Sequence, residues 1–126
     1  MLTNSSLMPT IPVTDIKKTK AFYDKNLGLT LAQEMSDMAI FAAGKNTKLL
    51  LYQRPHSQSD HALVSFEVKN IEQEVSNLKQ KGIRFEFYNL PGLKTNKQGI
   101  ASIPGAKSAW LKDLDGNILA ITQMLD

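Results

Sequence analysis

The sequence repeats itself, and this internal duplication constrains the fold more than any other feature. The pattern Ile11-x-Val13-x-Asp15-Ile16 returns 55 positions later as Phe66-x-Val68-x-Asn70-Ile71. A second match, at an offset of 54, pairs Leu27-Gly28-Leu29 with Lys81-Gly82-Ile83. In both halves an alternating apolar run leads into a residue type that caps helices, and a glycine of the kind that ends helices follows. The sequence therefore predicts two copies of one folding unit.

Each copy is expected to hold one strand, one helix and three further strands. In the first half, apolar residues alternate with threonine and proline over 7–14, which indicates a strand with one buried face. Asp15 is placed to cap a helix over 17–26, because its carboxylate can accept from the free N–H groups of the first turn. The three strands that follow are expected over about 29–35, 38–43 and 48–54.

The second half begins after a polar, turn-forming segment over 55–60, which we interpret as the linker. A strand is predicted over 61–68. Asn70 then caps a helix, and Gln73 completes a possible capping box with it. Another strand is predicted over 83–88.

The last third of the chain predicts a loop and a hairpin. Residues 89–107 are rich in Gly, Pro, Lys and Asn, which favours a long mobile loop with a short strand near 100–103. Asp115-Gly116 lies between two apolar runs, and both residues tolerate the backbone angles of a tight turn. The chain is therefore expected to close with a β-hairpin.

Composition bounds the location and the partners. The 126 residues, 42% hydrophobic and 21% charged, fit one globular domain. The 15 basic residues are scattered among 12 acidic ones, which disfavours nucleic acid as a partner. No apolar run approaches the roughly 20 residues of a membrane span, and no signal peptide is evident, so we expect a cytoplasmic protein without membrane contact. With no cysteine there are no disulfides, thiolate nucleophiles or cysteine-bound metals.

Three segments resemble the vicinal oxygen chelate superfamily, which includes glyoxalases, bleomycin resistance proteins and extradiol dioxygenases. They are Ile11-Pro12-Val13-Thr14-Asp15, the Phe-Tyr-x-x-x-Leu-Gly pattern within 21–29, and Asp113-Leu114-Asp115-Gly116-Asn117. The resemblance implies an α+β fold with two βαβββ modules forming a cupped mixed sheet of about eight strands, the helices on its convex face. It implies one domain over 1–126, with modules over about 7–54 and 61–126, and a homodimer.

The resemblance also implies where a divalent metal would be held, and this chain departs from that pattern. Carried over by position, the four ligand sites fall on Met8, Leu50, Leu63 and Ala120. None of these side chains is a usual ligand for a hard or borderline divalent ion. We therefore expect no bound metal and no cofactor.

Strand alternation assigns to the concave face a mixture of apolar side chains and a few polar groups, the make-up of a small-molecule site. The ligand-binding candidates are Met8, Thr10, Leu50, Tyr52, Arg54, Leu63, Ser65, Trp110, Ala120 and Thr122. Trp110 either stacks on a flat ligand or fills the cleft. Arg54 either holds an anionic group or makes a surface ion pair. Four lysines around the 89–107 loop favour an anionic ligand as well: Lys94, Lys97, Lys107 and Lys112.

Three functions remain open at this point. The first is a metal-free binding protein of the bleomycin-resistance type, which sequesters a drug or metabolite that is aromatic or anionic. The second is an enzyme, a glyoxalase-like lyase, a metal-independent isomerase or a dioxygenase, in which His61 and Glu67 are the acid–base candidates. The third is a dimeric scaffold with a vestigial cleft. The apolar cleft favours binding over catalysis.

Overall fold

The computed structural model describes residues 2–57 and 59–125. They form two compact units, Met1–Ser57 and Gln58–Asp126. The boundary falls inside the segment expected to link two modules, in which Gln58 lies outside the described residues, as do Met1 and Asp126. Over the described part of the chain, no helix has the length and apolarity needed to cross a membrane.

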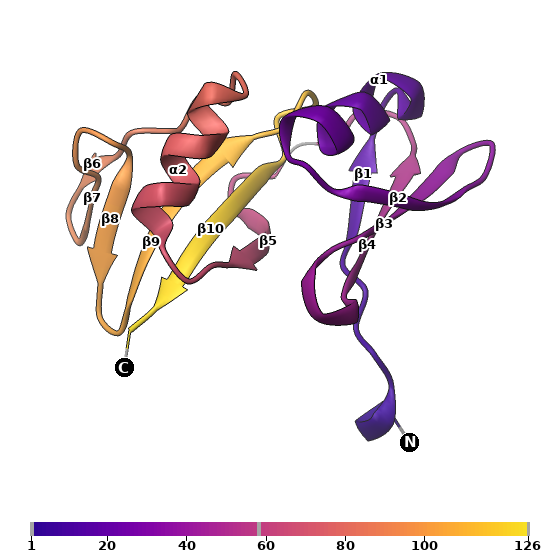
Figure 1. Cartoon of the computed structure of the whole chain (residues 1–126). Helices are drawn as coiled ribbons and strands as arrows, with labels where there is room; N and C mark the ends of the chain where they lie inside the picture. Colours follow the sequence, from indigo (N-terminus) through magenta and orange to yellow (C-terminus); the bar gives the residue numbers. More distant parts are fainter. Residues whose placement is uncertain (1, 58, 126) are drawn as a thin grey trace. The chain divides into compact units, whose positions relative to one another are not determined.

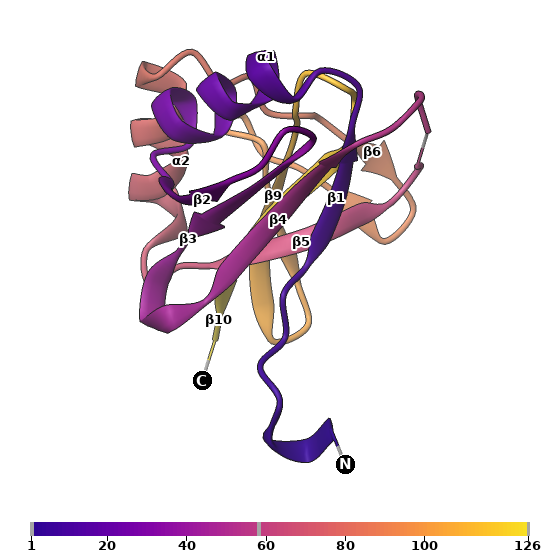
Figure 2. The ribbon, with the colours of Figure 1, turned by 90° about the vertical axis from the view of Figure 1, so that its right-hand side faces the viewer.

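The first unit follows the predicted order of one strand, one helix and three strands (Figure 1). Its elements are β1 (Thr10–Val13), α1 (Ile16–Ala21) continuing into a π-helical turn (Phe22–Asn26), β2 (Thr30–Glu34), β3 (Met38–Ala42) and β4 (Lys48–Gln53). The sheet order is β1-β4-β3-β2, with β1 parallel to β4 and the other pairs antiparallel. Figure 2 shows the four strands of this unit from the side.

The second unit repeats this topology. Its elements are β5 (Ala62–Glu67), α2 (Ile71–Gln80), β6 (Asn89–Leu90), β7 (Leu93–Lys94), β8 (Ile100–Ile103), β9 (Ala106–Lys112) and β10 (Ile118–Met124). The sheet order is β5-β10-β9-β8, and β5 is again parallel to β10. The predicted α+β fold with two βαβββ modules is therefore confirmed, with eight strands in two four-stranded mixed sheets.

Two predictions for the second unit need correction. Residues 83–88 do not form a regular strand. Their pairing with β9 is limited to a bridge, Phe85 to Leu111, and a hydrogen bond from Glu86 N–H to Trp110 O at 2.8 Å, while Tyr88 bonds to Thr95. The cause is that β8 already pairs with residues 106–109 of β9. Only the later residues of β9 are therefore free to pair with another segment on that side.

Residues 89–107 are more ordered than the predicted loop. They contain the β6–β7 hairpin, all of β8 and the start of β9. Gly92 and Gly105 make the two tight turns between these strands, with φ angles of 78° and 80° that side chains rarely adopt. The glycines that suggested a mobile loop therefore serve as turn residues between short strands.

Each helix covers one face of its own sheet. Helix α1 packs on β3 and β4, and α2 packs on β9 and β10. The apolar strand residues on the helix-covered faces are buried: Ile11, Val13, Leu49, Leu51, Leu111, Leu119 and Ile121. Val64, Phe66 and Val68 are only half-buried, unlike Ile11 and Val13 on β1, which is an edge strand as β5 is. This leaves each sheet with a second, helix-free face.

Both helices begin at the predicted caps. Asp15 Oδ1 accepts from the N–H groups of Lys17 and Lys18, at 3.1 and 3.3 Å. Asn70 Oδ1 accepts from Gln73 N–H at 3.1 Å. The Gln73 side-chain amide donates to Asn77 along the helix, so the Asn70 half of the predicted capping box is the half that is observed.

A glutamine from the last strand of each unit adds a second cap, which the sequence analysis missed. Ile16 N–H donates to Gln53 Oε1 at 3.0 Å, and Ile71 N–H donates to Gln123 Oε1 at 2.9 Å. The two isoleucines are the first residues of α1 and α2, where backbone N–H groups have no partner inside the helix. The same device in both units is structural evidence for the duplication.

Replacing this glutamine should destabilise the protein. We expect Gln123→Ala to lower the free energy of unfolding by about 1 kcal/mol, because a partly buried N–H loses its acceptor. Urea unfolding followed by circular dichroism measures the change. Gln33→Ala, on the exposed strand β2, is the matched control and should shift stability by less than about 0.5 kcal/mol. Equal changes in the free energy of unfolding of the two variants would show that the Gln123 cap contributes nothing to stability.

Candidate small-molecule site

In the first unit, three candidates share the helix-free face of the sheet. Thr10 is paired with Leu50 on the neighbouring strand, and Tyr52 lies two residues further along β4. Leu50 and Tyr52 are half-buried, and Thr10 is exposed. The other two candidates flank the strands, since Met8 precedes β1 and the exposed Arg54 follows β4. Arg54 Nε donates to the adjacent Pro55 carbonyl at 3.3 Å.

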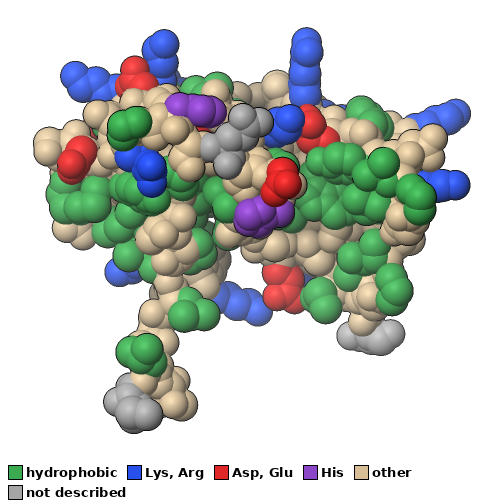
Figure 3. All heavy atoms as spheres, turned by 180° about the vertical axis from the view of Figure 1, so that it is seen from behind, with side chains coloured by type: hydrophobic (Ala, Val, Ile, Leu, Met, Phe, Trp, Pro, Cys, Tyr) green, Lys and Arg blue, Asp and Glu red, His purple; other side chains and the backbone are tan. Residues whose placement is uncertain are grey.

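In the second unit, strand register brings the candidates into two rows. The first row is Ser65, Ala120 and Trp110, and the second is Glu67, Thr122 and Ser108, each running from β5 across β10 to β9. The set alternates with Ala109, Leu111, Leu119 and Ile121, which lie under α2, so it belongs to the helix-free face, where Ala120 and Ser108 are also buried. Figure 3 views this unit from behind, and apolar side chains gather over it there.

Leu63 does not fit the simple alternation. Ile118 pairs with Ala62 and Leu119 with Val64, so Leu63 is an extra residue in β5 without a partner in the register. Such an irregularity turns the strand locally and changes where its side chains point. The assignment of Leu63 to the same face as Ser65 therefore lacks the support that alternation gave it.

Three hydroxyls on this face are linked by hydrogen bonds. Thr122 Oγ1 lies 2.7 Å from Ser65 Oγ and 2.9 Å from Ser108 Oγ. Ser65 is exposed, whereas Ser108 is 4% exposed. The sequence analysis named Ser65 and Thr122 but missed Ser108, although it lies at the same alternating position as Trp110 on β9.

Trp110 has an aromatic neighbour that the sequence analysis also missed. The Tyr88 ring meets it edge-on, with centroids 5.5 Å apart and an angle of 82°. Burial, and secondarily the negative charge of Glu86, raise the pKa of Tyr88, whereas Lys112 acts in the opposite direction. The phenol therefore stays protonated at neutral pH and can donate a hydrogen bond. Glu86 and Tyr88 lie at alternate positions of the predicted strand over 83–88. That alternation was the sequence signal that could have placed Tyr88 on the same face as Trp110.

Two of the four lysines expected to make the site basic are ion-paired. Lys107 Nζ lies 3.0 Å from Glu72 Oε2, and Lys112 Nζ lies 3.5 Å from Glu86 Oε1. The hydrogen bond from Lys107 is the main cause that lowers the pKa of Glu72. Pairing offsets the positive charge that would attract an anion, which weakens the expectation of an anionic ligand.

His61 and Glu67 do not form an acid–base pair. His61 precedes β5 and Glu67 ends it, which separates them by roughly 20 Å at the rise of an extended strand. His61 Nδ1 instead lies 3.2 Å from Asp60 Oδ1 and 3.2 Å from Ser59 Oγ. This separation disfavours joint action on one substrate atom, and a catalytic role for either residue stays a prediction.

The positions that the resemblance implies for a metal do not fit one. Met8 offers a thioether, and Leu50, Leu63 and Ala120 offer hydrocarbon, whereas Zn²⁺, Mg²⁺ and Mn²⁺ take imidazole, carboxylate or carbonyl ligands. Within either unit, over residues 2–57 and 59–125, no three His, Asp or Glu side chains lie together as a metal site requires.

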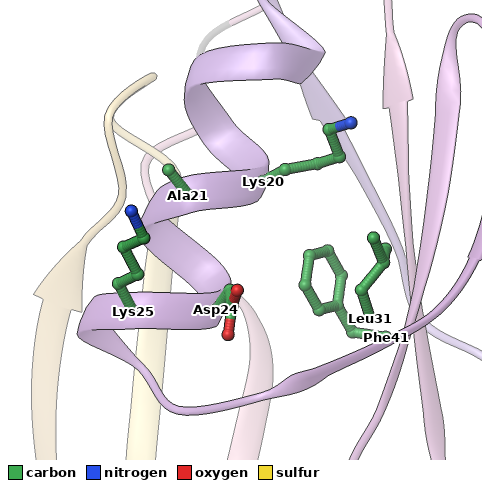
Figure 4. A pocket seen from close by; sticks show the side chains of 6 residues that line it. All are labelled: Lys20, Ala21, Asp24, Lys25, Leu31 and Phe41. Carbon is green, nitrogen blue, oxygen red and sulfur yellow. The ribbon is translucent and has the colours of Figure 1, made fainter.

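A hollow of about 240 Å³ lies elsewhere, beside α1 in the first unit (Figure 4). Its lining residues are Lys20, Ala21, Asp24, Lys25, Leu31 and Phe41. Lys20 is ion-paired with Glu34. This hollow contains none of the candidates, and it is smaller than most ligand pockets, which measure about 300–1,000 Å³.

Comparison with known proteins agrees with the fold. The model of the Glyoxalase/Bleomycin resistance protein/Dioxygenase superfamily matches residues 6–121. A search of curated proteins finds no match.

Several solved structures share the fold at low sequence identity. A glyoxalase/bleomycin resistance protein/dioxygenase from Alicyclobacillus acidocaldarius is 20% identical with a TM-score of 0.69, over 98% of this chain and 93% of that one. TnmS3, an antibiotic binding protein from Streptomyces sp. CB03234, is 20% identical with a TM-score of 0.69, over 98% of both chains. The fosfomycin resistance protein FosX from Listeria monocytogenes, complexed with Mn(II) and sulfate ion, is 16% identical with a TM-score of 0.69, over 98% of this chain and 92% of that one.

Proposed function

The chain belongs to the glyoxalase/bleomycin resistance protein/dioxygenase superfamily, and from this premise we propose that it binds a small organic molecule without a resident metal ion. The observation that carries the proposal is the chemistry of four positions. Met8, Leu50, Leu63 and Ala120 stand where the resemblance implies metal ligands, and none of them supplies oxygen or nitrogen from its side chain. In each unit, these positions offer apolar side chains in place of metal ligands.

The helix-free faces have the composition of a ligand site. In the second unit, Trp110 and Tyr88 supply aromatic area, and the linked hydroxyls supply a few oriented polar groups. Pockets for small molecules combine these two features. Two structural neighbours support small-molecule binding, since TnmS3 is an antibiotic binding protein and FosX, whose structure contains Mn(II), is a fosfomycin resistance protein.

The alternatives have less support. The enzyme hypothesis lost its proposed acid–base pair, because β5 separates His61 from Glu67. The vestigial scaffold predicts no ligand at all, which an experiment can distinguish. A homodimer and a cytoplasmic location stay predictions of the sequence analysis.

A binding screen tests the proposal. Metal-depleted protein is titrated calorimetrically with a panel of aromatic antibiotics and metabolites, and the protein as purified is analysed by native mass spectrometry for bound small molecules. We expect at least one ligand to bind at one molecule per chain and to be recovered chemically unchanged. A panel without binders, together with no co-purifying molecule, would favour the scaffold instead. A ligand that is converted to product would favour the enzyme.

A further inference from the structure

We infer that the Ser65–Thr122–Ser108 hydroxyl chain is the polar anchor of the binding face, and that it selects aromatic ligands with a neutral carbonyl over those with a carboxylate. The inference rests on the proposed function and names the ligand class for it. The geometry points to this class through the direction of the hydroxyl chain, the charges beside it and its position relative to Trp110.

The direction of the hydroxyl chain follows from a count of protons. Three hydroxyls carry three protons, and the two hydrogen bonds among them use two. If Ser65 donated inward, the remaining proton would lie on Ser108, which is 4% exposed, or, if Ser108 also donated to Thr122, on the half-buried Thr122. A buried donor without an acceptor costs about 1–3 kcal/mol.

The opposite direction avoids this cost. Ser108 donates to Thr122, Thr122 donates to Ser65, and the last proton lies on the exposed Ser65 hydroxyl. The chain of hydroxyls therefore presents a hydrogen-bond donor to the ligand. Each bond in such a chain polarises the next, so the terminal donor is stronger than an isolated serine. Its matching ligand group is an acceptor.

The charges near this donor disfavour an anionic acceptor. Glu67 is the register partner of Thr122, so its carboxylate belongs to the same face and lies one strand away. Lys107 belongs to the opposite face and pairs with Glu72, while Lys112 pairs with Glu86. A carboxylate ligand would therefore meet the negative charge of Glu67, with Lys107 and Lys112 already engaged in ion pairs, whereas a ketone or quinone oxygen carries no charge to be repelled.

The distance from the donor to Trp110 sets the size of the ligand. Ala120 lies between Ser65 and Trp110 in the register, so the hydroxyl and the indole are two strands apart. At the usual strand spacing this is about 10 Å between their backbones. A bicyclic aromatic body matches that distance, and Ala120 between the two is 5% exposed. Trp110, edge-on to Tyr88, then offers its ring to the aromatic part.

Three probes of nearly equal shape test the inference by calorimetry. They are 1-acetylnaphthalene, which has a neutral carbonyl, 1-naphthoate, which has a carboxylate, and 1-ethylnaphthalene, which has neither. We expect the acetyl compound to bind about tenfold more tightly than the ethyl compound, the value of one good hydrogen bond. Naphthoate should bind most weakly of the three, and Glu67→Gln should strengthen the binding of naphthoate alone.

Thr122→Val removes the middle hydroxyl and keeps the shape of the side chain. The tenfold preference for the acetyl compound should fall to about twofold, with the ethyl compound unaffected. Ser65→Ala, at an exposed position, should reduce the preference for the acetyl compound by the same amount. It replaces Thr122→Val as the test if that variant fails to fold. Thr30→Val on the exposed strand β2 is the matched control and should change nothing.

The possible failures are distinguishable. If none of the three probes binds, the proposed aromatic site is wrong and the inference falls with it. If all three bind equally, or if the acetyl preference survives both hydroxyl variants, the binding face stands but the hydroxyl anchor is wrong. Tightest binding of naphthoate would overturn the neutral class and favour the anionic ligand that the free lysines first suggested.

Discussion

Asp113→Ala is expected to lower the free energy of unfolding by about 3 kcal/mol, the largest effect on stability that we predict. Asp113 is 6% exposed in the turn between β9 and β10. Its Oδ1 accepts from Asp115 N–H and Asn117 N–H, both at 2.9 Å, and its Oδ2 accepts from the Asn117 side-chain amide at 2.9 Å. Alanine removes both oxygens and leaves three donors to find other partners.

Urea unfolding of the purified variants measures this effect. Asp37→Ala, in the exposed turn before β3, is the matched control and should change stability by less than about 0.5 kcal/mol. Asp113→Asn should be intermediate, because it keeps one acceptor but turns a second amide toward Asn117. A loss below about 1 kcal/mol for Asp113→Ala, or a loss of ligand affinity with unchanged stability, would contradict a structural role for the turn.

Trp110→Ala is expected to weaken ligand binding about thirtyfold, or roughly 2 kcal/mol, the largest effect on affinity that we predict. The prediction rests on the proposed function. Trp110 is half-buried on the helix-free face, and it is the single tryptophan in the chain. Truncation removes the largest flat apolar surface of that face and the partner of the Tyr88 ring.

Calorimetric titration with a ligand from the binding screen measures the loss. Trp110→Phe should retain about a third of the affinity, since a smaller ring remains. Phe87→Ala is the matched control, because Phe87 is an aromatic residue of the same unit that is 61% exposed and was assigned no ligand contact. Unchanged affinity in Trp110→Ala, with circular dichroism showing a folded protein, would place the ligand elsewhere.

The parts of the fold that the sequence predicted well are set by local patterns. Asp15 and Asn70 were recognised as caps because the residue type and the following three positions determine the interaction. The terminal hairpin was recognised because Asp115-Gly116 has a strong backbone preference. The duplication then fixed the topology, since a second copy of a strand–helix–strand pattern must form the same kind of sheet.

The features that the sequence did not reveal depend on contacts between distant residues. Gln53 lies 37 residues from Ile16, and nothing near it in the sequence signals a helix cap. The extra residue Leu63 depends on how β5 aligns with β10, more than 50 positions away. The same holds for Tyr88, which became a site residue only when its segment came to lie along the end of β9.

The central claim is that this member of the superfamily binds its ligand without a metal ion. The most direct test is a pair of calorimetric titrations with one ligand, before and after exhaustive chelation, with the metal content of each sample measured by elemental analysis. We predict equal affinities, one ligand per chain in both samples, and no gain on adding Mn²⁺ or Zn²⁺. Binding that disappears on chelation and returns with one equivalent of metal per chain would contradict the claim.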